Sequence, residues 1–576
     1  MKFGINKLDL LCVLCASVVN CFALDREAFT FTNYDLNVRV EPEQHRLGVR
    51  GKITLRNDTA TPQKIAVLQI SSSLDWRSIK AGDKPVQFVS QPYTSDIDHT
   101  GALSEAIVTL PEAVAPKATV ELEIAYEGVI LLDATRLTRI GTPEDVAQSS
   151  DWDQIAPSFT ALRGAGYVAW YPIATEVANL SEGDRLFEVL GRWKAREAGW
   201  KMSLHVDLRL PGQNPLPTIL LNRYQCTVAS SHEDELEYVL AGCTYQGFGL
   251  EDPVMVIAPY QKLGRPASMD IRFLRGHDGS AADYAKEAEK VLPLITEWFG
   301  APHERVRIAD LADPDCTSFE TGLMLFVALA NSNPDRISLQ SAHQLTHAAF
   351  FSPQPWIHEG LAHFAQALYL EHEKGRQAAL DYMGLHRSAF LEAEKQITPA
   401  KPEDELNHAL VNTTNEELYR SKAMYVWWML RDMMGDAALK KALASYRTEQ
   451  DTELSSMPHL VMAQTQRDLQ WFFADWVYHD RGLPDFKIES AFPHKTATDA
   501  YLVTITVDNL GAAGAEVPVT VKFKDGEVTK RFEVRAKSKA VMRVEVPAIP
   551  QEVIVNDGSV PESDLSNNTF KVETEK

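Results

Sequence analysis

The sequence predicts a multidomain α+β protein, and three observations support this fold class. Stretches that alternate apolar and polar residues, as half-buried strands do, occupy the first third of the chain and its last part. Between them, stretches with apolar residues at helical spacing alternate with short strands. The length of 576 residues exceeds what one hydrophobic core supports, and ordinary domain sizes give about three or four domains.

Residues 1–23 have the three-part layout of a secretory signal peptide: MKFGINK, the apolar run LDLLCVLCASVV, and NCFA. Asp9 interrupts the apolar run, which is shorter than the about 20 residues that a spanning helix needs. We therefore expect cleavage after Ala23, export to the periplasm or the extracellular space, and no transmembrane segment in the mature chain. An uncleaved membrane anchor is the alternative interpretation.

Residues 24–215 predict an N-terminal antiparallel β-sheet domain. The stretches YDLNVRVEPEQHRLGVRGKITLRND and ATVELEIAYEGVIL alternate at period two and are bounded by Pro, Gly, Asn and Asp. An irregular insertion from Arg136 to Gly166 interrupts this pattern. The sequence leaves open whether the insertion covers a cleft.

Residues 216–486 predict a mixed α/β domain, and residues 487–576 predict a β-sandwich. In the first, AADYAKEAEKVLPLITEWFG is a helix that Gly300 ends, and RVRIADL and FETGLMLFVAL are strands. Two helices follow, ISLQSAHQLTHAAFF and WIHEGLAHFAQALYL, separated by the helix breaker SPQP. In the second, YLVTITVDNLG, VPVTVKF, KRFEVRA and AVMRVEVP are short strands at sandwich-like spacing.

The composition narrows the class of partner. The formal net charge is −22, with no basic stripe, whereas affinity for phosphate backbones needs clustered Lys and Arg. We therefore expect neither nucleic acid nor anionic membrane as a partner. Hydrophobic residues make up 45% and charged residues 24%, which is typical of a globular protein.

Three of the six cysteines lie beyond the predicted signal peptide. Cys226 and Cys243 flank a polar turn between two predicted strands, where an exported protein can form a disulfide. Closing this loop stabilises a protein by about 3 kcal/mol. Two buried free thiols are the alternative. Cys316 has no neighbouring CxxC or CxxH pattern, so we interpret it as structural.

The stretch HQLTH has the spacing of a metal site. Residues i and i+4 lie about 40° apart around a helix, so His343 and His347 can bind one ion. The SPQP breaker reverses the chain, and the next helix brings Glu359 back toward them. Two histidines and a glutamate leave the fourth tetrahedral position of one zinc ion open to water. A catalytic zinc lowers the pKa of that water to near 7 and polarises the scissile carbonyl.

Gln344 occupies the position from which a carboxylate would take the water's proton. An amide can hold the water by a hydrogen bond but cannot accept a proton at neutral pH. General-base catalysis contributes about 10²–10⁴-fold, so we expect no normal peptidase rate from these residues. The alternative is that both histidines are ordinary helix residues and Glu359 caps the second helix. His358 and His363 lie about 140° apart and do not share a face; His363 is a candidate supporting partner of a ligand, or a substitute ligand.

The pattern HQLTH…WIHEGLAHF resembles the membrane alanyl aminopeptidase family of gluzincin zinc metallopeptidases, whose signature is HExxH followed by WLNEG. FETGLMLF is similar to the strand that carries the family's GAMEN motif, YRSKAM to YEKGAM, and WFFADWVYHDRGLPDF to the closing helix. The resemblance covers nearly the whole mature chain and implies a short bacterial-type member. It implies that residues 24–215 form a saddle-like domain, residues 216–486 a thermolysin-like metallopeptidase domain, and residues 487–576 an Ig-like β-sandwich.

The resemblance also implies residue roles. His343, His347 and Glu359 are implied as zinc ligands, with Gln344 in the general-base position. Glu320 is implied to hold the free α-amine of a peptide substrate, and Tyr419 to donate a hydrogen bond to the tetrahedral oxyanion. Taken without the resemblance, Glu320 fits a solvated strand carboxylate and Tyr419 a packed helix tyrosine.

Two main functional hypotheses follow. The first is an exported zinc metallopeptidase, aminopeptidase-like, that acts on peptides with Gln344 orienting the water. The second is a non-catalytic relative that binds peptides or a partner in the same cleft, and the intact ligands beside a missing base favour it. A purely structural role in a surface or periplasmic assembly is a third. The sequence specifies neither the substrate nor the oligomeric state.

Overall fold

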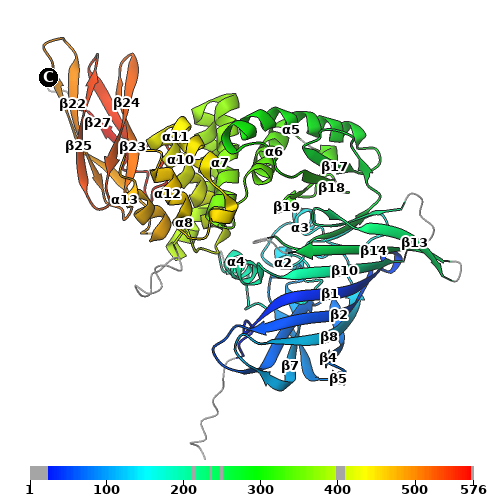
Figure 1. Cartoon of the computed structure of the whole chain (residues 1–576). Helices are drawn as coiled ribbons and strands as arrows, with labels where there is room; N and C mark the ends of the chain where they lie inside the picture. Colours follow the sequence, from blue (N-terminus) through cyan, green and yellow to red (C-terminus); the bar gives the residue numbers. More distant parts are fainter. Residues whose placement is uncertain are drawn as a thin grey trace, which may run out of the picture.

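The computed structural model describes residues 24–183, 185–209, 216–233, 236–246, 251–331, 333–396, 409–479 and 481–572. They form a β-rich N-terminal region, a central region rich in helices and a C-terminal β-sandwich, which confirms the predicted α+β fold class (Figure 1). The predicted signal peptide lies outside the described residues. Within the described ranges, every helix falls short of the length and apolarity that crossing a membrane requires.

The N-terminal region is built on an eight-stranded sheet. Its alternating sequence buries one face, as in β1, where Leu36, Val38 and Val40 are buried and their neighbours are exposed. In spatial order the strands are β13 (Thr227–Glu233), β14 (Leu236–Gln246), β10 (Lys201–Leu208), β1 (Phe29–Glu41), β2 (Arg46–Asn57), β8 (Thr119–Val129), β4 (Leu74–Ala81) and β5 (Lys84–Pro85). The sheet therefore continues past residue 215, as far as Gln246.

Two smaller sheets and three helices complete this region. One sheet contains β3 (Gln63–Ser71), β7 (Ala102–Val114) and β6 (Gln87–Thr94). The other contains β12 (Tyr224–Gln225), β11 (Thr218–Leu221), β15 (Met255–Ala258) and β9 (Thr160–Leu162). The helices are α2 (Thr135–Arg139), α3 (Glu144–Ser150) and α4 (Arg185–Glu197), and a 3₁₀ turn, η1 (Pro42–Gln44), joins β1 to β2.

A disulfide joins Cys226 to Cys243, with a Cα–Cα distance of 4.7 Å, which is one of the two alternatives that the sequence left open. Cys316 is a free, half-buried thiol. We expect the Cys226→Ser, Cys243→Ser double variant to lose about 2 kcal/mol of unfolding free energy. This is the lower end of the range that removal of a native disulfide typically costs. The measurement is the guanidinium midpoint, with Cys316→Ser as the control; equal midpoints for all three proteins contradict the prediction.

The central region combines a five-stranded mixed sheet with a group of helices. The strands, in spatial order, are β16 (Gln261–Lys262), β17 (Met269–Phe273), β18 (Val306–Asp310), β20 (Met324–Val327) and β19 (Phe319–Thr321). The helices are α5 (Asp278–Phe299), α6 (Pro334–Ala349), α7 (Pro355–Lys374), α8 (Arg376–Gln396), α10 (Ala423–Met434), α11 (Asp436–Ser445), α12 (Ser456–Met462) and α13 (Gln470–Phe473). Shorter turns are η2 (Leu329–Asn331), η3 (Leu418–Lys422), η4 (Thr448–Gln450) and η5 (Ala474–Tyr478).

The insertion from Arg136 to Gly166 packs against the loop that precedes edge strand β19. The indole nitrogen of Trp152 donates to the carbonyl of Thr317 at 3.0 Å, and the amide of Thr317 donates to Ser149 at 2.8 Å. The ring of Tyr167 lies 5.1 Å from that of Phe319, centroid to centroid. The N-terminal region therefore packs against β19 and the loop before it.

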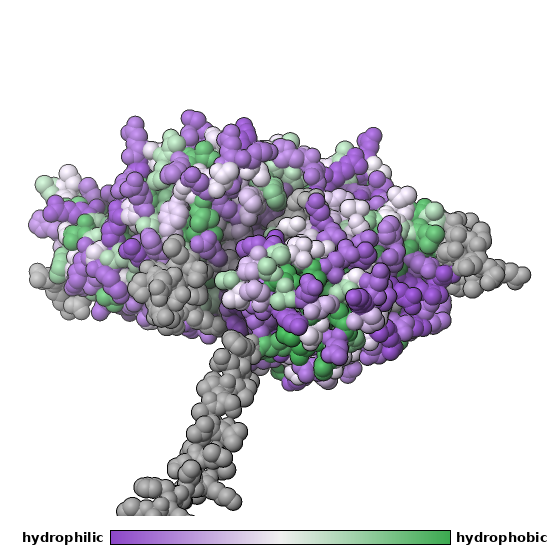
Figure 2. Space-filling view, turned by 60° about the horizontal axis from the view of Figure 1, so that its bottom comes forward, coloured by the Kyte–Doolittle hydropathy of each residue, from purple (hydrophilic) through white to green (hydrophobic). Residues whose placement is uncertain are grey.

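The C-terminal sandwich has two layers. One contains β21 (Phe486–Lys495), β22 (Tyr501–Asn509) and β25 (Lys539–Val546); the other contains β24 (Gly526–Val534), β23 (Ala515–Phe523), β26 (Pro550–Val555) and β27 (Thr569–Lys571). Its buried residues form one continuous core with the helices, and Trp476 of η5 donates to the carbonyl of Gly514 at 2.8 Å. The face in Figure 2 is mostly hydrophilic, with hydrophobic residues in separate patches.

Candidate metal centre

Helix α6 carries both histidines of the HQLTH stretch on its buried C-terminal half. Asn333 caps the helix, because its side chain accepts a hydrogen bond from the amide of Asp335, and Pro334 begins it. Residues 341–349 are all buried. His343 is 3% exposed and His347 5%, and their Nε2 atoms lie 2.9 Å apart. The predicted spacing therefore brings the two rings together.

A fixed turn between α6 and α7 returns the chain toward these histidines. Gln354 donates to Asp451 and accepts a hydrogen bond from the indole of Trp356 at 3.0 Å. The ring of Trp356 stacks on Trp427 of α10 at 5.2 Å. This packing sets the direction of α7, which places Glu359 3.6 Å from His343 and 3.6 Å from His347, oxygen to Nε2.

Glu320 approaches the same point from the sheet. It lies on edge strand β19, opposite Leu325 of β20, and its Oε1 is 2.7 Å from Nε2 of His343. Its side chain is 29% exposed, so one side of the group faces the solvent. The residues thus come from two helices and a strand.

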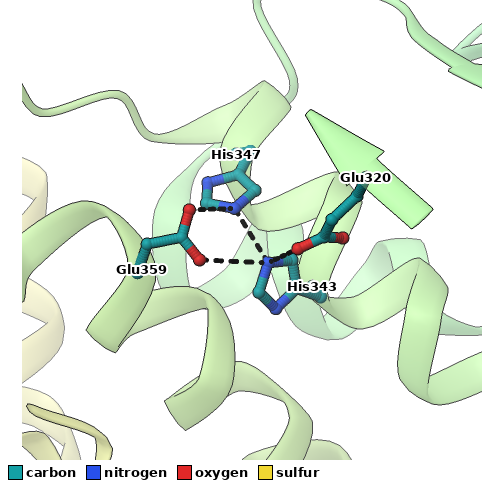
Figure 3. Close-up of side chains that lie close together, drawn as sticks. All are labelled: Glu320, His343, His347 and Glu359. Atoms are coloured by element: carbon teal, nitrogen blue, oxygen red, sulfur yellow. Dashed lines mark hydrogen bonds and ion pairs between the residues drawn. The ribbon is translucent and has the colours of Figure 1, made fainter. Parts of the chain in front are cut away.

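The four side chains converge on one point (Figure 3). One donor atom from each of Glu320, His343, His347 and Glu359 lies within 4.8 Å of the others. Two imidazole nitrogens and carboxylate oxygens are a donor set that Zn²⁺ prefers. Among the described residues, the buried Oε2 of Glu359 has no hydrogen-bond partner, although a buried carboxylate oxygen normally has one. The residues present therefore fit a zinc ion.

Burial and neighbouring charges shift the pKa values of three of the four side chains in different directions. Burial and the charge of His358 lower the pKa of His347 well below its usual value, which leaves that imidazole neutral. Burial also acts to lower the pKa of His343, but the carboxylates of Glu320 and Glu359 outweigh it and leave the pKa raised. Burial acts to raise the pKa of Glu359, but His347 and Arg420 outweigh it and lower that pKa well below its usual range. Glu359 is therefore ionised at neutral pH.

Gln344 contacts the site through Glu320. Its Nε2 donates a hydrogen bond to Oε2 of Glu320, and its own Oε1 has no hydrogen-bond partner among the described residues. Because a carboxylate only accepts, the amide nitrogen must be the atom that faces it. Gln344 thus lies beside the candidate metal group and is bound to Glu320, for which the family resemblance implied a different role.

Tyr419 lies outside the group of four donor atoms. It is 1% exposed in the π-helical turn η3, burial raises its pKa well above the usual value, and its hydroxyl bonds to Glu416. Its neighbour Arg420 faces the site instead, with Nε 3.5 Å from Oε2 of Glu359. The signal for Arg420 was present in YRSKAM, where the resembling motif YEKGAM has a glutamate.

An ion-pair chain connects this arginine to the N-terminal region. Arg420 pairs with Glu416 at 3.0 Å, Glu416 with Lys194 of α4 at 3.3 Å, and Lys194 with Asp252 at 3.1 Å. The helices meet closely here, because a Cβ on Gly191 would lie 1.7 Å from the carbonyl oxygen of Thr414. Sequence reasoning identified none of these contacts.

Two further histidines lie against His343 and His347. The ring of His358 lies 4.0 Å from that of His347, and the ring of His363 lies 4.8 Å from that of His343. His363 therefore lies against a predicted ligand, and its role as a supporting or substitute ligand stays a prediction.

A cavity of about 220 Å³ opens beside His347. Leu323, Ala348 and Phe351 give it an apolar wall, and His358 lies next to His347. Arg223 and Glu304, which pair with each other, lie on its polar side. A single amino-acid side chain fits this volume.

No protein-family model matches the chain, and no curated protein matches it. Solved structures similar to it include an M1 zinc metallopeptidase from Deinococcus radiodurans, as a mutant bound to a Tyr-Ser-Ala substrate. That comparison has 17% identity, covers 80% of this chain and 96% of that one, and has a TM-score of 0.46. The M1 zinc metallopeptidase from the same organism without that mutation has 18% identity, covers 80% and 95%, and has a TM-score of 0.44.

Proposed function

We propose that this protein is an exported, zinc-binding relative of metallopeptidases that binds peptides beside the metal and does not hydrolyse them at peptidase rates. His343, His347 and Glu359 hold the zinc. The observation that carries the proposal is the hydrogen bond from Gln344 to Glu320, because it fixes an amide where a proton acceptor is needed. The motif resemblance to the alanyl aminopeptidases supports the peptide as ligand.

The chemistry follows from the residues. A bound zinc supplies Lewis acidity, which polarises a carbonyl oxygen. Hydrolysis also needs a group that removes a proton from the attacking water, and Gln344 cannot accept one at neutral pH. Tyr419 is buried against Glu416, so its hydroxyl already has a hydrogen-bond partner. The cavity beside His347 can still hold a peptide side chain.

The test compares the wild-type protein with the Gln344→Glu variant. We expect both to contain one zinc per chain by mass spectrometry of the metal. We expect no detectable cleavage of alanyl-arylamide or Ala-Ala-Ala by the wild type and measurable cleavage by the variant, because a general base contributes about 10²–10⁴-fold. The matched control is Gln340→Glu, one turn earlier on α6, where Gln340 bonds to Ser318 and the same charge is added away from the metal.

Peptide binding is measured separately, by calorimetry with Ala-Ala-Ala and with larger tripeptides. Saturable binding by the wild type without turnover is the expected result. Turnover by the wild type that chelation abolishes and zinc restores contradicts the proposal. A wild type that contains no zinc after dialysis against zinc contradicts its metal part.

The other candidate is a zinc aminopeptidase in which Glu320 accepts the proton in place of residue 344. The observation that favours it is the 2.7 Å distance from Glu320 to His343, which places a carboxylate at the metal-binding group. Chelator-sensitive turnover by the wild type that disappears in Glu320→Gln is the result that selects it.

A further inference from the structure

We infer that Glu320 is the fourth protein ligand of the zinc, and that Gln344 is the positioning residue that holds it there. The site is then closed by protein and has no coordination position for water or a substrate carbonyl. This inference rests on the zinc binding of the proposed function and deepens it by giving the glutamine a task of its own.

The distances between donor atoms support a four-ligand set. Zinc ligands lie about 2.0–2.2 Å from the metal, so neighbouring donor atoms of a tetrahedron are about 3.3 Å apart. Nε2 of His343 lies 2.7 Å from Glu320, 2.9 Å from His347 and 3.6 Å from Glu359. All four donors stay within 4.8 Å of one another. Small side-chain movements place them around one ion.

The position of Glu320 is incompatible with reserving it for a peptide amine. An amine held by a carboxylate lies at about 2.7–2.9 Å from it, so the carboxylate must stand back from the metal ligands by the width of that amine. Here Oε1 touches the donor nitrogen of His343 directly, and Oε2 accepts from Gln344. Both carboxylate oxygens already have partners.

Gln344 directs the carboxylate. Groups that hydrogen-bond to a metal ligand fix its orientation, and removing such a group typically weakens metal binding about 10–100-fold. The amide holds Oε2 and thereby points Oε1 at the histidines. A glutamate at position 344 would set two carboxylates against each other and push Glu320 away. Glutamine in place of glutamate at position 344 therefore has two effects. It leaves the site without a proton acceptor, and it holds Glu320 at the metal, which closes the site.

Residues of the N-terminal region pack against the strand that carries Glu320. Phe319, its neighbour on β19, packs on Tyr167, and the guanidinium of Arg163 lies 5.4 Å from the Phe319 ring centre. The preceding Thr317 bonds to Ser149 and Trp152. The strand is thus braced before any metal binds, which favours a ligand over a movable substrate-binding group.

The experiment replaces zinc by Co²⁺ and follows the visible absorption of the metal while acetohydroxamate is added. We expect the wild-type spectrum to stay unchanged, because no position is open. We expect Glu320→Gln and Gln344→Glu to give spectra that change with acetohydroxamate. Competition with a chelator should show zinc binding at least about 10-fold weaker in Glu320→Gln and in Gln344→Ala. The control is Glu304→Gln, an exposed carboxylate of the neighbouring cavity that pairs with Arg223.

The outcomes separate the two proposals. A wild type that binds one metal and whose cobalt spectrum changes with acetohydroxamate overturns the closed site but leaves zinc binding intact. Unchanged zinc affinity in both Glu320→Gln and Gln344→Ala also overturns the closed site and leaves zinc binding intact. A wild type that binds no metal overturns the proposed function as well. If a variant fails to fold, the wild-type titration alone decides.

Discussion

A His343→Ala variant should lose zinc binding by more than about 100-fold, the upper effect of removing a group that only orients a ligand. His343 is the centre of the cluster, because its Nε2 lies within 3.6 Å of Glu320, His347 and Glu359. Without it, two carboxylates and one imidazole face each other with no central donor. The measurement is zinc affinity by chelator competition.

Thermal denaturation gives an independent check on the same variant. A ligand that binds only the folded state at about 1,000 times its Kd stabilises a protein by about 4 kcal/mol. We therefore expect zinc to raise the Tm of the wild type and to leave that of His343→Ala unchanged. His372→Ala is the matched control, because His372 lies on α7 with its side chain 65% exposed. An equal rise of Tm in both variants would falsify the metal assignment.

Gly360→Ala should cost about 3 kcal/mol of unfolding free energy, the upper part of the range for overpacking. Gly360 follows Glu359 on α7, and a Cβ there would lie 2.6 Å from the Cβ of Ala423 and 3.1 Å from Trp427. The gain in helix propensity of about 1 kcal/mol is too small to compensate. Because α7 must move away from α10, Glu359 moves too, so we also expect weaker zinc binding.

A second substitution distinguishes this clash from a general defect. Ala423→Gly removes the methyl group that the new side chain meets, so the Gly360→Ala, Ala423→Gly double variant should recover both stability and zinc affinity. Gly384→Ala on α8 is the control, since a Cβ added there would meet no atom of the described residues within 4 Å, and it should be neutral or slightly stabilising. Denaturant midpoints for the set decide the matter; a double variant as unstable as Gly360→Ala excludes the clash as the cause.

Local sequence patterns predicted the helices and strands, whereas the contacts between their side chains depend on tertiary packing. His343 and His347 could be placed on one face because a four-residue spacing fixes the angle around a helix. The contact between Gln344 and Glu320 could not be predicted, because it joins a helix to an edge strand 24 residues away. Periodicity likewise predicted the strands at Thr227 and Leu236 but not their place in the N-terminal sheet, since alternation carries no information about strand order.

The roles of single residues were hardest to predict where ion pairs join the N-terminal and central regions. Tyr419 was the residue that the motif resemblance emphasised, yet the side chain next to Glu359 is that of Arg420. Its ion pair with Glu416 could be inferred from an i, i+4 spacing. The pair between Glu416 and Lys194 could not, because the residues are 222 positions apart and meet only after α4 packs against the central region.

If zinc binds as proposed, the ion-pair chain from Lys194 to Glu359 makes its affinity depend on how the N-terminal and central regions are placed relative to each other. A change in the angle between the N-terminal and central regions alters the ion pair of Lys194 with Glu416. Because Arg420 pairs with both Glu416 and Glu359, a weaker pair between Lys194 and Glu416 draws Arg420 toward Glu416 and away from Glu359. A fragment of the central region without α4 would lack Lys194, so Arg420 would be the one cation of this ion-pair chain left to pair with Glu416. The geometry around Glu359 is thus a property of the assembled chain, because residues of both regions form the ion pairs beside it.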